Sequence, residues 1–261
     1  MSLSKSQLDA YHRDGFVFPI PVLSTAEVEA ACRALDGVLT RCGAPAQRVP
    51  STHAYFRWAY ELAAHPRILD AVETILGPDI LVWGTLILSK AAHTRYIVPW
   101  HQDGAYAAYL NGAGAVSAWI ALTPVNSENG CMRFLPGSFG QLLPFTDEPD
   151  PDSMIKRGQR VLAQIDETKA VDQELAPGEA SLHEVTLVHG SHANGSDAPR
   201  TGFIVRYTTP AMRQTKHPLF CVRGTPRNIA VCPAPPATDP EDHYRAYSEF
   251  LRSELAKSPA D

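Results

Sequence analysis

The chain lacks several features that mark other classes of protein. Its 261 residues carry a net charge of −5, so neither a basic footprint for nucleic acid nor a polybasic membrane patch is expected. No apolar run approaches the about 18 residues of a membrane span, and the N-terminal residues contain no apolar segment typical of a signal peptide. These absences predict a protein that binds neither nucleic acid nor membrane.

Cysteine is scarce and shows no pairing pattern. The five cysteines are scattered without a C-x-x-C pair, which argues against a zinc ribbon and a disulfide framework and predicts reduced thiols in a cytoplasmic protein. No glycine-rich phosphate loop follows a predicted strand, and no internal repeat stands out.

The composition is that of a globular protein. Apolar residues make up 44% and charged residues 20%, which suits a single domain over residues 1–261 with a sizeable core. Residues from 1 to about 78 predict helices. One helix ends at Gly15, a second begins at the capping box Ser24–Glu27, and a third covers 66–77.

Short β-rich runs dominate from about residue 79. Turn-forming residues separate five such runs, at residues 79–90, 114–125, 130–138, 179–191 and 201–210. Most of them have no helical pattern between them, which favours an antiparallel barrel or jelly roll over about 79–210 rather than a parallel sheet. The predicted fold class is therefore mainly β with flanking helices, the last of them at about 240–256.

One segment interrupts the strands, at about residues 139–175. It is acidic, contains prolines, and has a possible helix at 154–165. Two interpretations stay open: a solvated surface insertion, or a lid over the mouth of the barrel, because long loops inside compact domains are often binding loops.

Two of the β-rich regions carry residues that bind metals. His101 and Asp103 stand two residues apart in the stretch WHQDGAY and would share a side if the chain is extended there. Alternation along a later strand puts His183 and His189 on one face, and His192, three residues after His189, is an alternative ligand. Two histidines and one carboxylate form a facial triad that suits Fe(II), because three adjacent coordination positions stay open.

The residues after His189 extend this pattern. The stretch HGSHANGSDAPR contains Ser191, Asn194 and, eleven residues after His189, Arg200. Together with the upstream HQD and the intervening ENGCMRFLPGSFG, it resembles the phytanoyl-CoA dioxygenase family of Fe(II)/2-oxoglutarate-dependent oxygenases, over about residues 80–210. The resemblance implies a double-stranded β-helix, the cupin-like jelly roll.

The resemblance also implies roles for particular residues. The implied iron ligands are His101, Asp103 and His189. Arg200 would bind the distal carboxylate of 2-oxoglutarate, a role that suits the planar fork of a guanidinium. Ser191 and Trp119 would lie near this co-substrate.

Other residues leave alternatives open. His183 either lines the substrate site or is a satisfied core histidine. Arg206 has the same parity as Arg200, and either binds an anionic substrate or forms an internal ion pair. Tyr106 is a candidate substrate contact, with core or rim packing as the alternative. Asn194 is expected to organise the turn after His189 through side-chain hydrogen bonds.

The implied activity is oxidation of a small metabolite. With Fe(II), 2-oxoglutarate and dioxygen, the enzyme would hydroxylate an unactivated C–H bond and release succinate and CO2. Relatives that halogenate replace the metal-binding carboxylate with a small residue, so the presence of Asp103 favours hydroxylation. Two alternatives are a non-catalytic ligand-binding protein on the same barrel and a zinc hydrolase. A lost metal ligand or co-substrate arginine would favour the first, and Arg200 has no use in the second.

Overall fold

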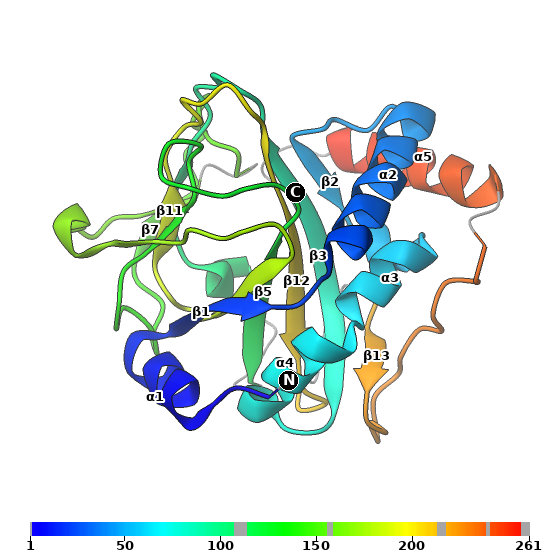
Figure 1. Ribbon diagram of the computed structural model, residues 1–261, viewed down its shortest axis with the longest axis horizontal. Helices are drawn as coiled ribbons and strands as arrows, with labels where there is room; N and C mark the ends of the chain where they lie inside the picture. Colours follow the sequence, from blue (N-terminus) through cyan, green and yellow to red (C-terminus); the bar gives the residue numbers. More distant parts are fainter. Residues whose placement is uncertain (1, 107–113, 156–158, 213–217, 239–240, 257–261) are drawn as a thin grey trace.

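The computed structural model describes residues 2–106, 114–155, 159–212, 218–238 and 241–256 (Figure 1). The helices of this part are α1 (Lys5–Asp14), α2 (Thr25–Cys42), α3 (Arg57–Ala63), α4 (Pro66–Leu76) and α5 (Glu241–Ala256), with the short 3-10 helices η1 (Thr52–Ala54), η2 (Asp103–Tyr106) and η4 (Glu167–Lys169). The strands are β1 (Phe16–Pro21), β2 (Arg48–Pro50), β3 (Ile80–Lys90), β4 (Val98–His101), β5 (Ala115–Ala121), β6 (Met132–Phe134), β7 (Phe145–Thr146), β8 (Arg160–Val161), β9 (Val171–Asp172), β10 (Glu179–Glu184), β11 (His189–Ser191), β12 (Arg200–Thr208) and β13 (Phe220–Arg223).

Two antiparallel sheets form the body of the structure. The major sheet has the order β1-β10-β5-β12-β3-β13, with β2 also paired to β3, and the minor sheet has the order β4-β11-β6-β9. The chain crosses from one sheet to the other several times, as in a jelly roll. The predicted fold class, a double-stranded β-helix with flanking helices, is confirmed.

The helices cover the outer face of the major sheet. Figure 1 shows α2, α3 and α5 on one side of this sheet and β11 on the other. Alternate strand residues explain the arrangement, because Phe203, Val205 and Tyr207 pack with the helices in the largest apolar cluster. Residues of opposite parity point to the interior between the sheets.

Two helix boundaries that the sequence predicted in the N-terminal part are confirmed. Helix α1 ends at Gly15, which has a φ of 87° in the left-handed region. Helix α2 begins at the predicted capping box, where the side chain of Ser24 accepts from the backbone of Glu27 and the Glu27 carboxylate accepts from the backbone of Ser24.

Two sequence expectations were wrong. The run 179–191 is not one strand: the chain turns between β10 and β11 and passes from the major sheet to the minor one. The possible helix at 154–165 is not formed by the described residues there, since Arg160–Val161 pair with Phe145–Thr146 as a hairpin. In the part of the chain described, no helix is long and apolar enough to cross a membrane.

Candidate metal centre

Three side chains that could hold a metal ion converge between the two sheets. His101 ends β4, His189 begins β11, and these two residues pair directly in the minor sheet. Asp103 is the first residue of η2. One ligand atom from each of the three residues lies within 4.8 Å of the others, and all three residues are buried.

Backbone carbonyls orient the two imidazoles. Nδ1 of His101 donates to the carbonyls of Pro99 and His189 at 2.9 and 3.0 Å, and Nδ1 of His189 donates to the carbonyl of Leu187 at 3.0 Å. A carbonyl can only accept, so both rings carry their proton on Nδ1 and present the lone pair of Nε2. This is the usual arrangement of metal-binding histidines.

The carboxylate is oriented differently from the imidazoles. The chain is not extended through residues 101–103, because Asp103 follows the end of β4 and starts a 3-10 helix. Its oxygens contact the opposite sheet: Ser117 Oγ donates to Oδ2 at 2.7 Å, and an Arg206 Nη donates to Oδ1 at 3.1 Å. Nε2 of His183 lies 3.7 Å from Oδ2.

The protonation states suit a divalent cation. Burial alone would raise the pKa of Asp103, but Arg206, His183 and the other two imidazoles hold this pKa well below its ordinary value. Burial lowers the pKa of His101, and burial together with the two neighbouring imidazoles lowers the pKa of His189 well below its usual range. The three residues therefore offer two neutral nitrogens and one anionic oxygen.

A second group of side chains next to the centre is cationic. Arg200 is fully buried, and its Nε and Nη1 have no hydrogen-bond partner among the described residues. Lys90, its direct partner across β12 and β3, is equally buried and donates to Ser191 Oγ at 2.7 Å and to the carbonyl of His192. The Arg200 guanidinium lies over the ring of Trp119, 5.3 Å from its centre.

Neither buried cation has a carboxylate partner in the part of the chain described. Burial lowers the pKa of Lys90 to about 6, with a further contribution from Arg200, and burial lowers the pKa of Arg200 to about 10. Buried cations are normally paired. A buried guanidinium without a carboxylate partner in the described part of the chain, next to a lysine that a bound carboxylate would favour in its charged form, therefore fits an anionic co-substrate.

The structure brings together most of the site residues that the sequence indicated. Trp119, Ser191 and Arg200 lie together, and the rings of His183 and His189 are 4.8 Å apart. This closeness does not come from alternation along one strand, because the chain turns between the two histidines. The side chain of Tyr106 lies outside what the structure describes, so its role stays a prediction.

Two residues of the site were not predicted. Lys90 ends an apolar strand, and Ser117 is a polar residue within the otherwise apolar β5. The available signal was a polar residue inside an apolar, fully buried strand. Burying a polar group without a hydrogen-bond partner is costly, so such a residue indicates a polar partner in the interior. Asn194 organises its turn as expected: its Oδ1 accepts from the backbone and hydroxyl of Ser196, and its Nδ2 donates to two carbonyls.

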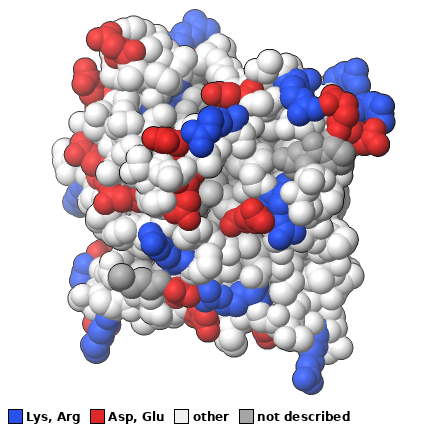
Figure 2. All heavy atoms as spheres, turned by 45° about the vertical axis from the view of Figure 1, so that its right-hand side comes forward, with Lys and Arg blue, Asp and Glu red and all other residues white. Residues whose placement is uncertain are grey.

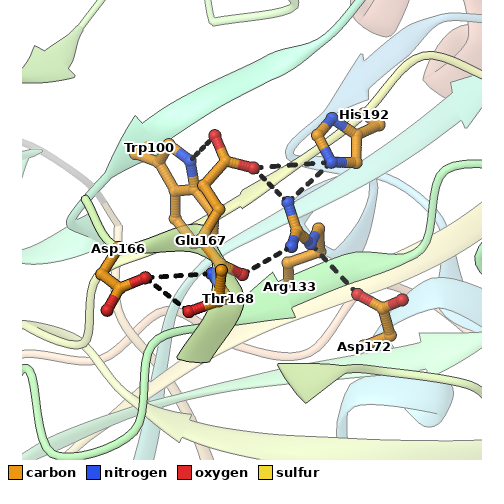
Figure 3. Close-up of polar contacts among 7 residues, drawn as sticks. All are labelled: Trp100, Arg133, Asp166, Glu167, Thr168, Asp172 and His192. Carbon is orange, nitrogen blue, oxygen red and sulfur yellow. Dashed lines mark hydrogen bonds and ion pairs between the residues drawn. The ribbon is translucent and has the colours of Figure 1, made fainter. Parts of the chain in front are cut away.

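A polar network lies on the back of the metal-binding sheet (Figure 3). Arg133 of β6 contacts Glu167 of η4, Asp172 of β9 and Nε2 of His192, and Trp100 Nε1 donates to Glu167 at 3.3 Å. His192 is therefore engaged away from the three metal-binding side chains. The network attaches the end of the 139–175 insertion to the minor sheet; whether the rest of the insertion acts as a lid stays a prediction.

The fold and the centre define a jelly roll in which two histidines and one aspartate could hold a metal ion. Sequence comparison agrees with this class. The sequence profile of the phytanoyl-CoA dioxygenase (PhyH) family matches residues 11–202. The L-proline trans-4-hydroxylase of Streptomyces griseoviridis is 30% identical over 154 residues, 53% of this chain and 57% of that protein.

Solved structures give the same class. The apo form of the non-heme monooxygenase ThoJ is similar with a TM-score of 0.73 at 32% identity, covering 94% of this chain and 98% of ThoJ. EvdO2 from Micromonospora carbonacea var. aurantiaca, complexed with 2-oxoglutarate, has a TM-score of 0.65 at 25% identity over 79% of this chain and 91% of EvdO2.

The chain belongs to the phytanoyl-CoA dioxygenase (PhyH) family. This confirms the resemblance seen in the sequence. The chain spans 50%, 57% and 66% of the lengths of three curated relatives, so it matches about half to two thirds of them.

Proposed function

We propose that the protein is an Fe(II)- and 2-oxoglutarate-dependent oxygenase that hydroxylates an unactivated C–H bond of a small metabolite. The observation that carries this proposal is the fully buried Arg200, whose Nε and Nη1 lack partners among the described residues, in the same interior as the His101–Asp103–His189 triad. A zinc hydrolase has no use for such a cation, whereas a dianionic co-substrate does.

Different residues would bind the metal and the co-substrate. When bound, Fe(II) and 2-oxoglutarate supply an oxidant from dioxygen, with release of succinate and CO2. His101, Asp103 and His189 would hold the metal and would leave positions on it for the co-substrate and dioxygen. Arg200 and Lys90 hold the distal carboxylate, with Ser191 and Trp119 beside them. Because Asp103 would take the coordination position that a halide would need, its presence favours hydroxylation.

The decisive experiment is an anaerobic titration of the Fe(II) protein with 2-oxoglutarate. We expect the weak visible charge-transfer band of the chelate, and an Arg200→Ala variant should bind iron normally but 2-oxoglutarate about 100-fold more weakly, because a buried charged pair is lost. Arg223→Ala is the matched control, since Arg223 pairs with Asp70 and Glu73 away from the centre. Absence of the band in folded, iron-loaded protein would contradict the proposal.

The two alternatives predict other outcomes. A non-catalytic ligand-binding protein would release no succinate with any compound of a metabolite panel, and a zinc hydrolase would consume no oxygen. For the proposed reaction, oxygen uptake should accompany a product heavier by one oxygen atom.

The substrate class follows from the relatives and the charge of the surface. Some curated relatives are named for the small compounds proline and ectoine and others for phytanoyl-CoA. We favour the first kind, because a net charge of −5 does not suit the several phosphates of a coenzyme A thioester. On the face shown in Figure 2, Lys and Arg are interspersed with Asp and Glu, which supports a small-molecule substrate rather than nucleic acid. His183 is our candidate substrate contact: it is buried, and neither ring nitrogen has a hydrogen-bond partner among the described residues.

We also propose a cytoplasmic location, supported by five unpaired cysteines.

A further inference from the structure

A polar row crosses the inner face of the major sheet at the level of the metal centre. His183 of β10 pairs with Ser117 of β5, and Ser117 pairs with Arg206 of β12. Residues directly opposite each other on neighbouring strands share a face, so the three side chains point to the same interior. The next row of this face contains Ser181 and Trp119, and is no longer directed at Asp103.

Two members of this row hold the Asp103 carboxylate, one on each oxygen. Ser117 is fully buried and donates to Oδ2 at 2.7 Å, while Arg206 donates to Oδ1 at 3.1 Å. The ring nitrogens of His183 stay beyond hydrogen-bond distance of Asp103. Two donors on different oxygens fix the plane of the carboxylate and still leave a lone pair on each oxygen for a metal.

Asp103 needs this support more than the two histidines do. His101 and His189 stand on strands paired with each other, and carbonyls of their own region fix their rings. Asp103 stands on a 3-10 helix that begins two residues after β4 ends, and the contacts of its side chain come from the opposite sheet. The direction of its carboxylate is therefore set by the major sheet rather than by its own element.

We propose that Ser117 and Arg206 are positioning residues, which hold Asp103 ready to bind the metal, and that Arg206 is not the cation that recognises the substrate. Arg206 is not assigned to the substrate because its guanidinium already neutralises the buried Asp103 carboxylate and lies over the ring of Trp83. The proposal depends on the proposed function only for the identity of the metal. Outer partners of metal ligands commonly change metal affinity by about 10- to 100-fold.

The test is Co(II) binding to the apo-protein without 2-oxoglutarate or oxygen, followed by calorimetry and by the visible d–d spectrum. We expect Ser117→Ala and Arg206→Met to weaken Co(II) binding by about 10- to 100-fold and to alter the spectrum, which reports ligand geometry. Arg206→Lys keeps the positive charge but loses the guanidinium group. It should therefore weaken Co(II) binding less than Arg206→Met does. This variant also keeps Asp103 paired if Arg206→Met does not fold.

The controls are buried or paired residues of the same types. Ser181→Ala removes a fully buried hydroxyl that contacts Gln173, one row away, and Arg223→Lys alters a partly buried arginine paired with two other carboxylates. Both should bind Co(II) like the unmodified protein.

Normal Co(II) affinity and spectrum in Ser117→Ala, or an equal loss in Ser181→Ala, would overturn the proposal. So would Arg206→Lys with unchanged affinity and spectrum. The outcome is separate from that of the proposed function, because a protein that never forms the 2-oxoglutarate chelate would still give a readable Co(II) comparison.

Discussion

At the scale of single residues, the most informative side chain is a lysine that no motif indicated. Lys90 is buried between Arg200, Ser191 and the carbonyl of His192, and its pKa is lowered to about 6 by burial and then by Arg200. A neutral lysine here avoids two adjacent buried cations. Because a bound carboxylate would favour the charged form, the protonation of Lys90 should be linked to co-substrate binding.

The linkage predicts how 2-oxoglutarate affinity depends on pH. Below pH about 6 Lys90 is already charged, so affinity should be constant. As the pH rises above this value, binding must take up a proton, and affinity should fall by up to about tenfold per pH unit. Anaerobic 2-oxoglutarate titrations from about pH 6 to 8.5 would measure this dependence.

Lys90→Met is the matched variant for this prediction. It should bind 2-oxoglutarate more weakly at low pH and lose most of the pH dependence, because Arg200 stays charged up to a pKa of about 10. A slope in Lys90→Met as steep as in the unmodified protein would assign the proton to another group.

Residue types and spacing in the sequence indicated three candidate metal ligands that the structure brings together, but not their surroundings. His101, Asp103 and His189 could be found because a ligand set has few chemical solutions. Lys90 and Ser117 could not be assigned, because their roles depend on strand register. Ser117 reaches Asp103 only because β5 lies between β10 and β12, an order that the sequence does not state.

At the scale of elements, the close approach of β12 to β5 shapes the co-substrate end of the site. A Cβ on Gly202 would lie 1.9 Å from Cζ2 of Trp119, so the indole occupies the space that a side chain would take. The glycine thus leaves room for the Trp119 indole next to Arg200.

We predict that Gly202→Ala destabilises the protein by about 1–3 kcal/mol, as overpacked cores do, and weakens 2-oxoglutarate binding by displacing Trp119. Gly84→Ala is the control on the neighbouring strand β3, where an added Cβ meets nothing within 4 Å. Chemical denaturation and co-substrate titration measure both effects. Equal stability of the two variants would show that the indole can move without cost.

The Arg133 network predicts how the insertion is attached. Arg133 joins η4 and β9 to β6 through Glu167 and Asp172. We expect Arg133→Ala to increase hydrogen exchange of residues 166–172 strongly, while the global free energy of unfolding changes by only about 1 kcal/mol because the carboxylates are partly exposed.

Arg95→Ala is the control for this variant, since Arg95 pairs with Asp152 of the same insertion and is largely exposed. It should leave the exchange of 166–172 unchanged. Exchange in Arg133→Ala that matches the unmodified protein would mean that strand pairing, not this network, holds the segment.

Alternation correctly placed Arg200 and Arg206 on one face of β12, but it could not show where a strand leaves its sheet. The run 179–191 is β-rich, and no Gly, Pro or Asn between β10 and β11 marks the turn. Pairing with β5 on one side of the turn and with β4 and β6 on the other determines the break. Such pairing is a property of the whole fold.

At the scale of the whole molecule, the metal centre links distant parts of the chain. His101 and His189 are 88 residues apart, and Asp103 is tied to the major sheet through Ser117 and Arg206. A metal ion bound to all three ligands therefore crosslinks the two sheets in the folded state. The unfolded chain does not bring these ligands together, so the ion binds mainly the folded protein.

Metal binding should consequently stabilise the protein against heat. At a free metal concentration about 100 times the Kd, the expected gain is about 2.7 kcal/mol, which for a chain of this size corresponds to a rise in Tm of about 5–10 °C. Calorimetry with Mn(II) or Co(II), reversed by a chelator, measures the shift. His189→Gln removes one ligand from β11 and should lose most of the gain; a shift of the same size in this variant would place the stabilising ion somewhere other than between the sheets.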